Sequence, residues 1–220
     1  MARKPRALRP GDLIGVMAPA GPVDEERLRR GAAELEGLGF AVRLGEGILE
    51  RRGFTAGSVD DRLDQLHELF EDPEVAAVAC ARGGAGILHL LPHLDRELLR
   101  DNPKLLLGYS DVTLLHLEME RIGLTSLHGP MVARELAEGD GAYDPASLRH
   151  ALTGEGAPYA SQPDELLTLA AEHSLGAAPT SRRCSSSRTW TRSRTAWIGC
   201  CGSCGPRARC RESPASSSAT

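Results

Sequence analysis

Ser110 stands where a short apolar run gives way to a helical pattern, in the stretch Leu105-Leu-Leu-Gly-Tyr-Ser-Asp-Val-Thr113. The leucines predict a buried strand, and residues 112–120 predict the helix that follows it. A serine in the turn between them would project its hydroxyl from the carboxyl edge of a sheet, beside the unpaired N–H groups at the start of the helix. Such a serine suits nucleophilic attack that creates an oxyanion. The alternative is that Ser110 is only the N-cap of the helix.

A glycine-rich turn, Arg82-Gly83-Gly84-Ala85-Gly86, directly follows another apolar run at residues 75–81. Glycine lets the backbone come close to a ligand and turn an N–H toward it. The spacing is not the G-x-G-x-x-G of dinucleotide-binding folds, and no P-loop lysine follows. These glycines could therefore hold an anionic group, or they could simply form a tight turn.

The histidines near these turns are weaker candidates. His128, in Leu-His-Gly-Pro-Met131, could contact a substrate, although a single His beside Gly-Pro is more often structural. His116 lies about one and a half turns past Ser110 on the predicted helix, so it should face elsewhere and make a poor base. Glu172 and His173 are adjacent in sequence and cannot share one helix face.

Alternating strands and helices must position these groups. Apolar strands are predicted at 13–18, 41–44 and 75–81, ahead of the one that precedes Ser110. Asp24 should cap the first helix, whose apolar positions are Leu28, Ala32, Leu35 and Leu38. The second helix should begin at a capping box, Ser58-Val-Asp-Asp61, and carries the apolar residues Leu63, Leu66 and Phe70. The pattern predicts an α/β fold with a doubly wound, mainly parallel sheet of the flavodoxin/Rossmann-like kind, whose ligands gather at the carboxyl ends of the strands. After Met131 the sequence is rich in Gly and Pro, and we predict loops there.

Composition changes sharply near residue 181. The chain has 220 residues, 41% of them hydrophobic, which is enough for one large domain or two small ones. No apolar run reaches 18 residues and the start lacks a signal peptide's apolar core, so we expect a soluble cytoplasmic protein. Residues 181–220, however, carry eight Arg against one Glu, hold five of the six Cys and both Trp, and contain no Leu, Val, Phe, Asp or Lys.

Four interpretations compete for this tail. A Ser/Arg-rich stretch could be a disordered arm that binds nucleic acid. Cys201 and Cys204 form one C-x-x-C, but no second such pair or His pair lies at zinc-finger spacing. A disulfide framework is not expected without an export signal. The fourth interpretation is translation out of frame, because Arg, Ser, Cys, Gly and Trp are what GC-rich DNA encodes when read in the wrong phase.

The out-of-frame interpretation can be tested on paper. If GC-favoured codons are chosen for Cys184 through Cys204 and the phase is shifted by two nucleotides, the reading becomes LVLEDVDEVPYRLDRLLRQL. This is an apolar strand followed by an amphipathic helix. A random shift would seldom restore such periodicity, so we favour a frameshift and expect the tail to be disordered.

The motifs taken together resemble the bacterial LD-carboxypeptidase family, serine peptidases that include murein tetrapeptide LD-carboxypeptidases and the microcin C immunity peptidase. The resemblance covers roughly residues 10–155. It rests on GDLIGVMAPAGP, DPEVAAVACARGGAG, NPKLLLGYSDVTLLH and LHGPM, in the family's order and spacing. It implies that the parent enzyme releases a terminal D-amino acid, typically D-Ala, from murein tetrapeptides in peptidoglycan recycling, with no metal or cofactor.

The resemblance also implies roles for residues of this chain. Ser110 would be the nucleophile, and Asp111 with Gly83 or Gly84 would supply backbone N–H groups to the oxyanion hole. Arg82 and His128 would contact the substrate, a muropeptide. The family's catalytic Glu and His come from a second domain that is missing here, since the restored LVLED pattern falls at codons 187 and 188 and the His would follow the chain's end.

We therefore divide the chain into an N-terminal α/β domain (1–135), a linker (136–165), the start of a second domain (166–181) and the out-of-frame tail (182–220). We expect this fragment to be inactive, although its parent is a serine carboxypeptidase. A microcin-immunity-like peptidase and a non-catalytic module that binds a small ligand are the alternatives. We expect neither nucleic acid nor membrane as a partner, and a homodimer stays open for the full-length parent.

Overall fold

A parallel sheet forms the centre of the molecule. The computed structural model describes residues 3–139, 141–155 and 196–197. The strand order is β2-β1-β3-β4-β5-β6, and every neighbouring pair is parallel. The first five strands thus follow the flavodoxin-like order, and the predicted doubly wound α/β fold is confirmed. The strands are β1 (Leu13–Met17), β2 (Ala41–Leu44), β3 (Val75–Cys80), β4 (Leu105–Gly108), β5 (Leu127–His128) and β6 (Ala196–Trp197).

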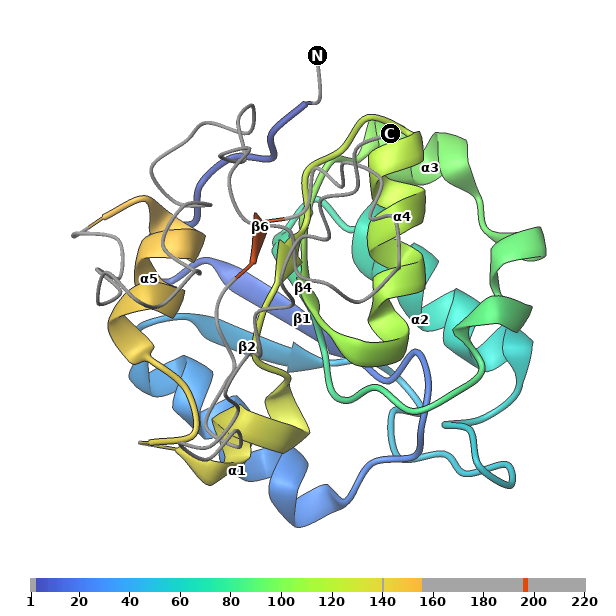
Figure 1. The fold of residues 1–220 in the computed structure, drawn as a ribbon, viewed down its shortest axis with the longest axis horizontal. Coiled ribbons are helices and arrows are strands. Elements are labelled where there is room, and N and C mark those ends of the chain that lie inside the picture. Colours follow the sequence, from blue (N-terminus) through green and yellow to red (C-terminus); the bar gives the residue numbers. More distant parts are fainter. Residues whose placement is uncertain (1–2, 140, 156–195, 198–220) are drawn as a thin grey trace, which may run out of the picture.

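Helices cover both faces of this sheet (Figure 1). One face packs against α1 (Glu25–Gly37), the π-helical segment η4 (Val132–Leu136) and α5 (Pro145–Thr153). The other packs against α2 (Val59–Glu71), α3 (Arg96–Asp101) and α4 (Thr113–Arg121). Three short 3-10 turns complete the described elements: η1 (Ile87–His89), η2 (Leu91–His93) and η3 (Ser110–Val112).

The side chains of β3 show why the strands are apolar throughout. Successive residues of a strand point to opposite faces of the sheet. Ala77 and Ala79 enter the core beneath α1, whereas Val78 and Cys80 enter the core beneath α2. Every residue of β3 is buried, as is typical of a parallel sheet covered on both faces.

The predicted helix starts of α1 and α2 are confirmed. The Asp24 carboxylate accepts a hydrogen bond from the N–H of Arg27 at 2.9 Å. At α2, the Ser58 hydroxyl accepts from the N–H of Asp61 at 3.1 Å, and the Asp61 carboxylate accepts from the N–H of Ser58 at 2.7 Å. These caps satisfy N–H groups in the first turns of both helices, which have no acceptor within the helix.

The expectation of loops after Met131 is wrong for two segments. The η4 segment forms a wide turn directly on α1, where Gly31 leaves room for it: a Cβ on that glycine would lie 1.7 Å from the Val132 carbonyl oxygen. Helix α5 starts at Asp144, whose carboxylate accepts from the N–H of Ser147 at 2.7 Å. The tertiary contact at Gly31 cannot be seen in local sequence.

Helix α5 belongs to the same packed unit as the sheet. Leu148 and Leu152 are buried in the core beneath α1, and the Leu152 carbonyl accepts a hydrogen bond from the N–H of Leu8 at 2.9 Å. The described part of the expected linker, 136–165, therefore includes a docked helix. The expected start of a second domain at 166–181, with Glu172 and His173, and all of the tail except Ala196–Trp197 lie outside the described residues.

None of the helices in the described ranges is long and apolar enough to cross a lipid bilayer.

Candidate active site

Ser110 occupies a sharp turn at the carboxyl end of β4. Its φ is +65°, and it is the one non-glycine residue with positive φ in the part of the chain that the structure describes. Such a conformation is uncommon for a residue with a Cβ. Tyr109, in extended conformation, takes the N-cap position of η3, so the interpretation of Ser110 as an N-cap is wrong. Ser110 is exposed at the edge of the sheet.

The glycine turn after β3 lies directly against Ser110. A Cβ placed on Gly83 would lie 2.8 Å from the Cβ and 2.9 Å from the Oγ of Ser110. Glycine is required at this position because any side chain would collide with the serine. The structure thus brings together two turns that are adjacent in the sheet, since β3 pairs with β4.

Hydrogen bonds fix the direction of the peptide between Gly83 and Gly84. The Gly83 carbonyl accepts from the N–H of Gly21 at 3.1 Å and from the Nε of Arg82 at 3.2 Å. In a planar trans peptide the N–H of Gly84 points away from that carbonyl. Gly84 has φ of +140°, which glycine tolerates, and a Cβ there would meet the backbone N of Gly21 at 2.9 Å.

The turn after β4 offers a second N–H group. Asp111 lies in the first turn of η3, where backbone N–H groups have no acceptor within the helix. Its carboxylate instead reaches back and accepts a hydrogen bond from the N–H of Ile87 at 3.0 Å. The side chain of Asp111 thereby ties the serine turn to the glycine turn, and its own amide stays at the edge beside Ser110.

Arg82 supports the glycine turn from the side. Its guanidinium donates from Nη1 to the Pro22 carbonyl at 3.1 Å, in addition to the bond from Nε to Gly83. The side chain is half-buried. These contacts fasten the turn after β3 to the turn after β1, which is a structural role alongside any contact with substrate.

His116 is buried beneath the site and is committed to the fold. Its Nε2 lies 2.8 Å from the Gly108 carbonyl and its Nδ1 lies 2.9 Å from the Ser126 hydroxyl. Because a carbonyl only accepts, Nε2 carries the proton and Nδ1 accepts from the hydroxyl. Burial lowers the pKa of His116 to about 4, so the imidazole is neutral near pH 7. This geometry agrees with the expectation that His116 is not the base for Ser110.

His128 lies at the carboxyl end of β5, beside the residue that precedes the serine. Its ring centroid is 5.8 Å from that of Tyr109 and 5.9 Å from that of His116. Partial burial lowers the pKa of His128 below its usual value. The His128 ring therefore packs beside Tyr109, the residue before Ser110, and the lowered pKa favours the neutral imidazole.

The carboxylate of Glu135 lies near the site, although no sequence pattern had identified it as a site residue. Glu135, from η4, accepts a hydrogen bond from the Tyr109 hydroxyl at 2.6 Å and one from the N–H of Met131 at 3.2 Å. Burial, followed by the bond to Glu135, raises the pKa of Tyr109 to about 12. The contact fixes the side chain immediately before Ser110, and only the irregular η4 turn brings Glu135 there. No local pattern signals such a turn.

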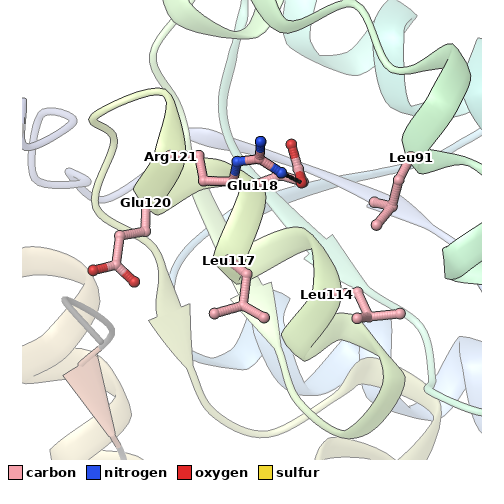
Figure 2. A pocket seen from close by; sticks show the side chains of 6 residues that line it. All are labelled: Leu91, Leu114, Leu117, Glu118, Glu120 and Arg121. Atoms are coloured by element: carbon pink, nitrogen blue, oxygen red, sulfur yellow. Dashed lines mark hydrogen bonds and ion pairs between the residues drawn. The ribbon is translucent and has the colours of Figure 1, made fainter. Parts of the chain in front are cut away.

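A groove in the described part of the chain lies elsewhere. Figure 2 shows this groove, of about 470 Å³, with side chains from α4 and from the η2 turn on its walls. Glu118 in its wall is paired with Arg121 at 3.0 Å and with Arg96 at 2.8 Å. None of the site residues described above lines the groove. Within residues 3–139 and 141–155, no group of three or more His, Cys, Asp or Glu is placed to bind a metal ion together.

The chain matches known proteins across this site. The profile of the LD-carboxypeptidase N-terminal domain matches residues 14–129. A probable murein peptide carboxypeptidase from Bacillus subtilis is 44% identical over 138 residues, which are 62% of this chain and 43% of that protein. The murein tetrapeptide carboxypeptidase of Pseudomonas aeruginosa is 37% identical over 119 residues, 54% of this chain and 39% of that protein.

Solved structures agree with this similarity. The crystal structure of an MccF-like protein from Bacillus anthracis superposes with a TM-score of 0.64 at 33% identity, covering 69% of this chain and 47% of that one. The match spans less than half the length of each of these relatives. The profile match extends over more than half of this chain and includes both turns of the candidate site. The chain therefore belongs to the LD-carboxypeptidase family, whose N-terminal domain it contains.

Proposed function

We propose that Ser110 is the nucleophile of a serine carboxypeptidase that releases a terminal D-amino acid, D-Ala, from murein tetrapeptides during cytoplasmic peptidoglycan recycling. The observation that carries the proposal is the conformation of Ser110, at φ of +65° in an exposed turn with Gly83 packed directly against it. Strain of this kind at a sheet edge is a hallmark of nucleophilic serines.

The chemistry follows from the two turns. The Ser110 Oγ attacks the carbonyl carbon of the bond to the D-residue while a base takes the hydroxyl proton. The carbonyl oxygen gains negative charge, and the N–H groups of Asp111 and Gly84 are the donors that stabilise it. The C–N bond then breaks, the D-amino acid leaves with the proton on its amine, and water hydrolyses the acyl-enzyme.

Two candidate bases near the serine in the described ranges are already held by other groups. The imidazole of His116 is held by Gly108 and Ser126, and the Glu135 carboxylate is held by Tyr109 and Met131. In the family resemblance, the Glu and His of the triad come from the second domain. We therefore propose that the 220-residue chain is an inactive fragment of an active parent.

The test compares three proteins for release of D-Ala from murein tetrapeptide. We expect almost no release by the 220-residue chain, because losing triad members costs on the order of 10^4 or more in rate. A frame-corrected, full-length version should turn over, and its Ser110→Ala variant should fall by a similar factor. Turnover by the short chain that Ser110→Ala abolishes would show that a base lies within residues 1–220, with His128 the first to replace.

A microcin-immunity-like peptidase is the second candidate, favoured by the structural similarity to the MccF-like protein of Bacillus anthracis. The same full-length protein would be offered murein tetrapeptide and processed microcin C side by side. Faster cleavage of the microcin would replace the first proposal. Binding of either compound without cleavage would instead indicate a non-catalytic module.

A further inference from the structure

Arg62 is a buried cation beside the carboxyl edge of the sheet. The residue lies in the first turns of α2 and is only 2% exposed. Buried charges are rare in proteins unless they are paired or fully hydrogen-bonded. Burial lowers the pKa of Arg62, although arginine still keeps its charge. A buried guanidinium at this place therefore needs partners, and the surrounding loops supply them.

Three loops converge on this guanidinium. Its Nη1 donates to the Pro19 carbonyl at 2.8 Å, after β1, and to the Gly86 carbonyl at 3.1 Å, after β3. Its Nε donates to the Ser58 carbonyl at 2.9 Å, at the start of α2. A Cβ on Gly86 would lie 3.0 Å from Nη1, so the glycine turn packs directly on the cation.

The positive charge of Arg62 also faces the serine turn. The carboxylates of Asp111 and Asp61 are its electrostatic partners. Asp111 accepts the hydrogen bond from Ile87, the residue after Gly86. The peptide group between Gly86 and Ile87 is therefore held on both sides, by the cation at its carbonyl and by the Asp111 carboxylate at its N–H.

We infer that Arg62 is a positioning residue that sets the glycine turn at residues 82–86 against the serine turn at residues 109–111. The inference rests on the proposed function in one respect: the N–H groups whose separation it fixes, those of Gly84 and Asp111, are the oxyanion donors of that proposal. The hydrogen bonds of the Arg62 guanidinium go to the carbonyls of Pro19, Ser58 and Gly86 and not to Ser110. Arg62 acts through Gly86, Ile87 and Asp111.

Lysine cannot reproduce this arrangement. Arginine offers donors in a planar fork that reaches several carbonyls at once, whereas lysine carries one compact charge on a flexible stem. Arg62→Lys would keep the charge opposite Asp111 and lose part of the carbonyl contacts. Arg62→Met would lose both, so that the Pro19 carbonyl loses this donor and the Gly86 carbonyl keeps the N–H of His89 alone.

The test uses amide NMR of the 220-residue chain, with hydrogen exchange measured at Ile87 and amide shifts followed at Gly84 and Asp111. In Arg62→Met we expect the Ile87 amide to exchange roughly tenfold faster or more than in the wild type, after correction for global stability. The Gly84 and Asp111 amide resonances should move, and Arg62→Lys should restore part of the change. Arg29→Met is the matched control, because Arg29 lies on α1 with its exposed side chain paired to Glu25.

Asp111→Asn keeps the test decisive if Arg62→Met does not fold. It preserves the shape and an acceptor for Ile87 while removing the charge that faces Arg62. Movement of the Gly84 and Gly86 resonances in this variant supports the coupling. If these resonances and the Ile87 exchange stay as in the wild type, the inference is overturned.

Kinetics of the full-length, frame-corrected protein add a readout that plain destabilisation would not give. We expect Arg62→Lys to lower kcat by about 100-fold, as for a misplaced oxyanion donor, with little change in KM. A rise in KM alone would contradict the inference. If the full-length wild type cleaves nothing, the proposed function fails, but the NMR result still decides the role of Arg62.

Discussion

The two edges of the sheet are built by different means. At the amino edge, an exposed ion pair closes the turn before β1, where Arg6 binds Asp12 with contacts of 2.5 and 3.0 Å, and Lys104 before β4 is a buried cation of that edge. At the carboxyl edge, a buried cation together with a buried neutral imidazole and tightly packed glycines holds the turns. Water can replace the exposed contact between Arg6 and Asp12. The turns beside Ser110 are held by buried contacts that water cannot replace, as the proposed nucleophile requires.

The largest expected difference between the two edges is the response of stability to acid, which acts at the carboxyl edge through His116. Its pKa is lowered to about 4 in the folded chain, against about 6.5 in an unfolded one, so the unfolded state binds the extra proton. Stability from this residue is fully present above about pH 6.5 and is lost as pH falls toward 4. The loss is on the order of 3 kcal/mol in the free energy of unfolding. Urea unfolding of the 220-residue chain at a series of pH values measures it.

His116→Gln is the informative variant, because glutamine can donate to Gly108 and accept from Ser126 without titrating. We expect the dependence of stability on pH in this window to become shallower. Some slope should persist, since the lowered pKa of His128 acts with the same sign. His93→Gln, at an exposed histidine, serves as the control. An unchanged slope in His116→Gln would mean that the imidazole does not hold the end of β4 in its neutral form.

Replacing one glycine at each edge by alanine compares the stability cost of a side chain at the two edges directly. Gly83→Ala should cost about 1–3 kcal/mol by overpacking, because its Cβ would meet Ser110 at 2.8 Å. Gly11→Ala, at the amino edge, has open space around its Cβ and only its φ of +83° to oppose it, a cost of about 1 kcal/mol. Thermal unfolding gives both values. An equal cost, or a larger one at Gly11, would remove the distinction between the edges.

The smallest effect is expected at the amino edge. Arg6→Met breaks the pair with Asp12, and the cost should stay below about 1 kcal/mol because the Arg6 side chain is 55% exposed and solvent screens it. The hydrogen bond from Arg6 lowers the pKa of Asp12, so this stability is present above the usual aspartate pKa and is lost at lower pH. Salt at about 1 M should shrink the difference between variant and wild type. A salt-independent cost above that bound would make this pair resemble the buried contacts of the other edge.

Local patterns were sufficient for the elements that carry their own signals. Apolar runs located the strands around the site, and the caps at Asp24 and Ser58 located two helices. The family resemblance implied that Gly83 or Gly84 acts together with Ser110, whereas the order of the strands, which makes β3 and β4 neighbours, came from the structure. Helix α3 was not predicted, since six residues give little periodicity.

The contacts that cross the fold could not be read from the sequence. Arg62 lies in the first turn of a helix, where charged residues are usually solvated. Its burial depends on contacts with loops from two other places in the chain, at Pro19 and Gly86. Glu135 reaches Tyr109 only through the irregular turn of η4. Aspartate at 144 followed by proline at 145 was a readable start signal for α5, but the glycine-rich surroundings obscured it.

The hydrogen bond between Leu8 and Leu152 has a consequence for the order in which the protein is made. Leu8 leaves the ribosome among the first residues, yet it is buried at 2% exposure by a helix that is synthesised after every strand from β1 to β5. A nascent chain that ends at residue 129, where the family match ends, would contain the glycine turn and the serine turn but would lack Glu135 and the cover over Leu8. Both turns of the candidate site are therefore synthesised before the packed unit that holds them is complete.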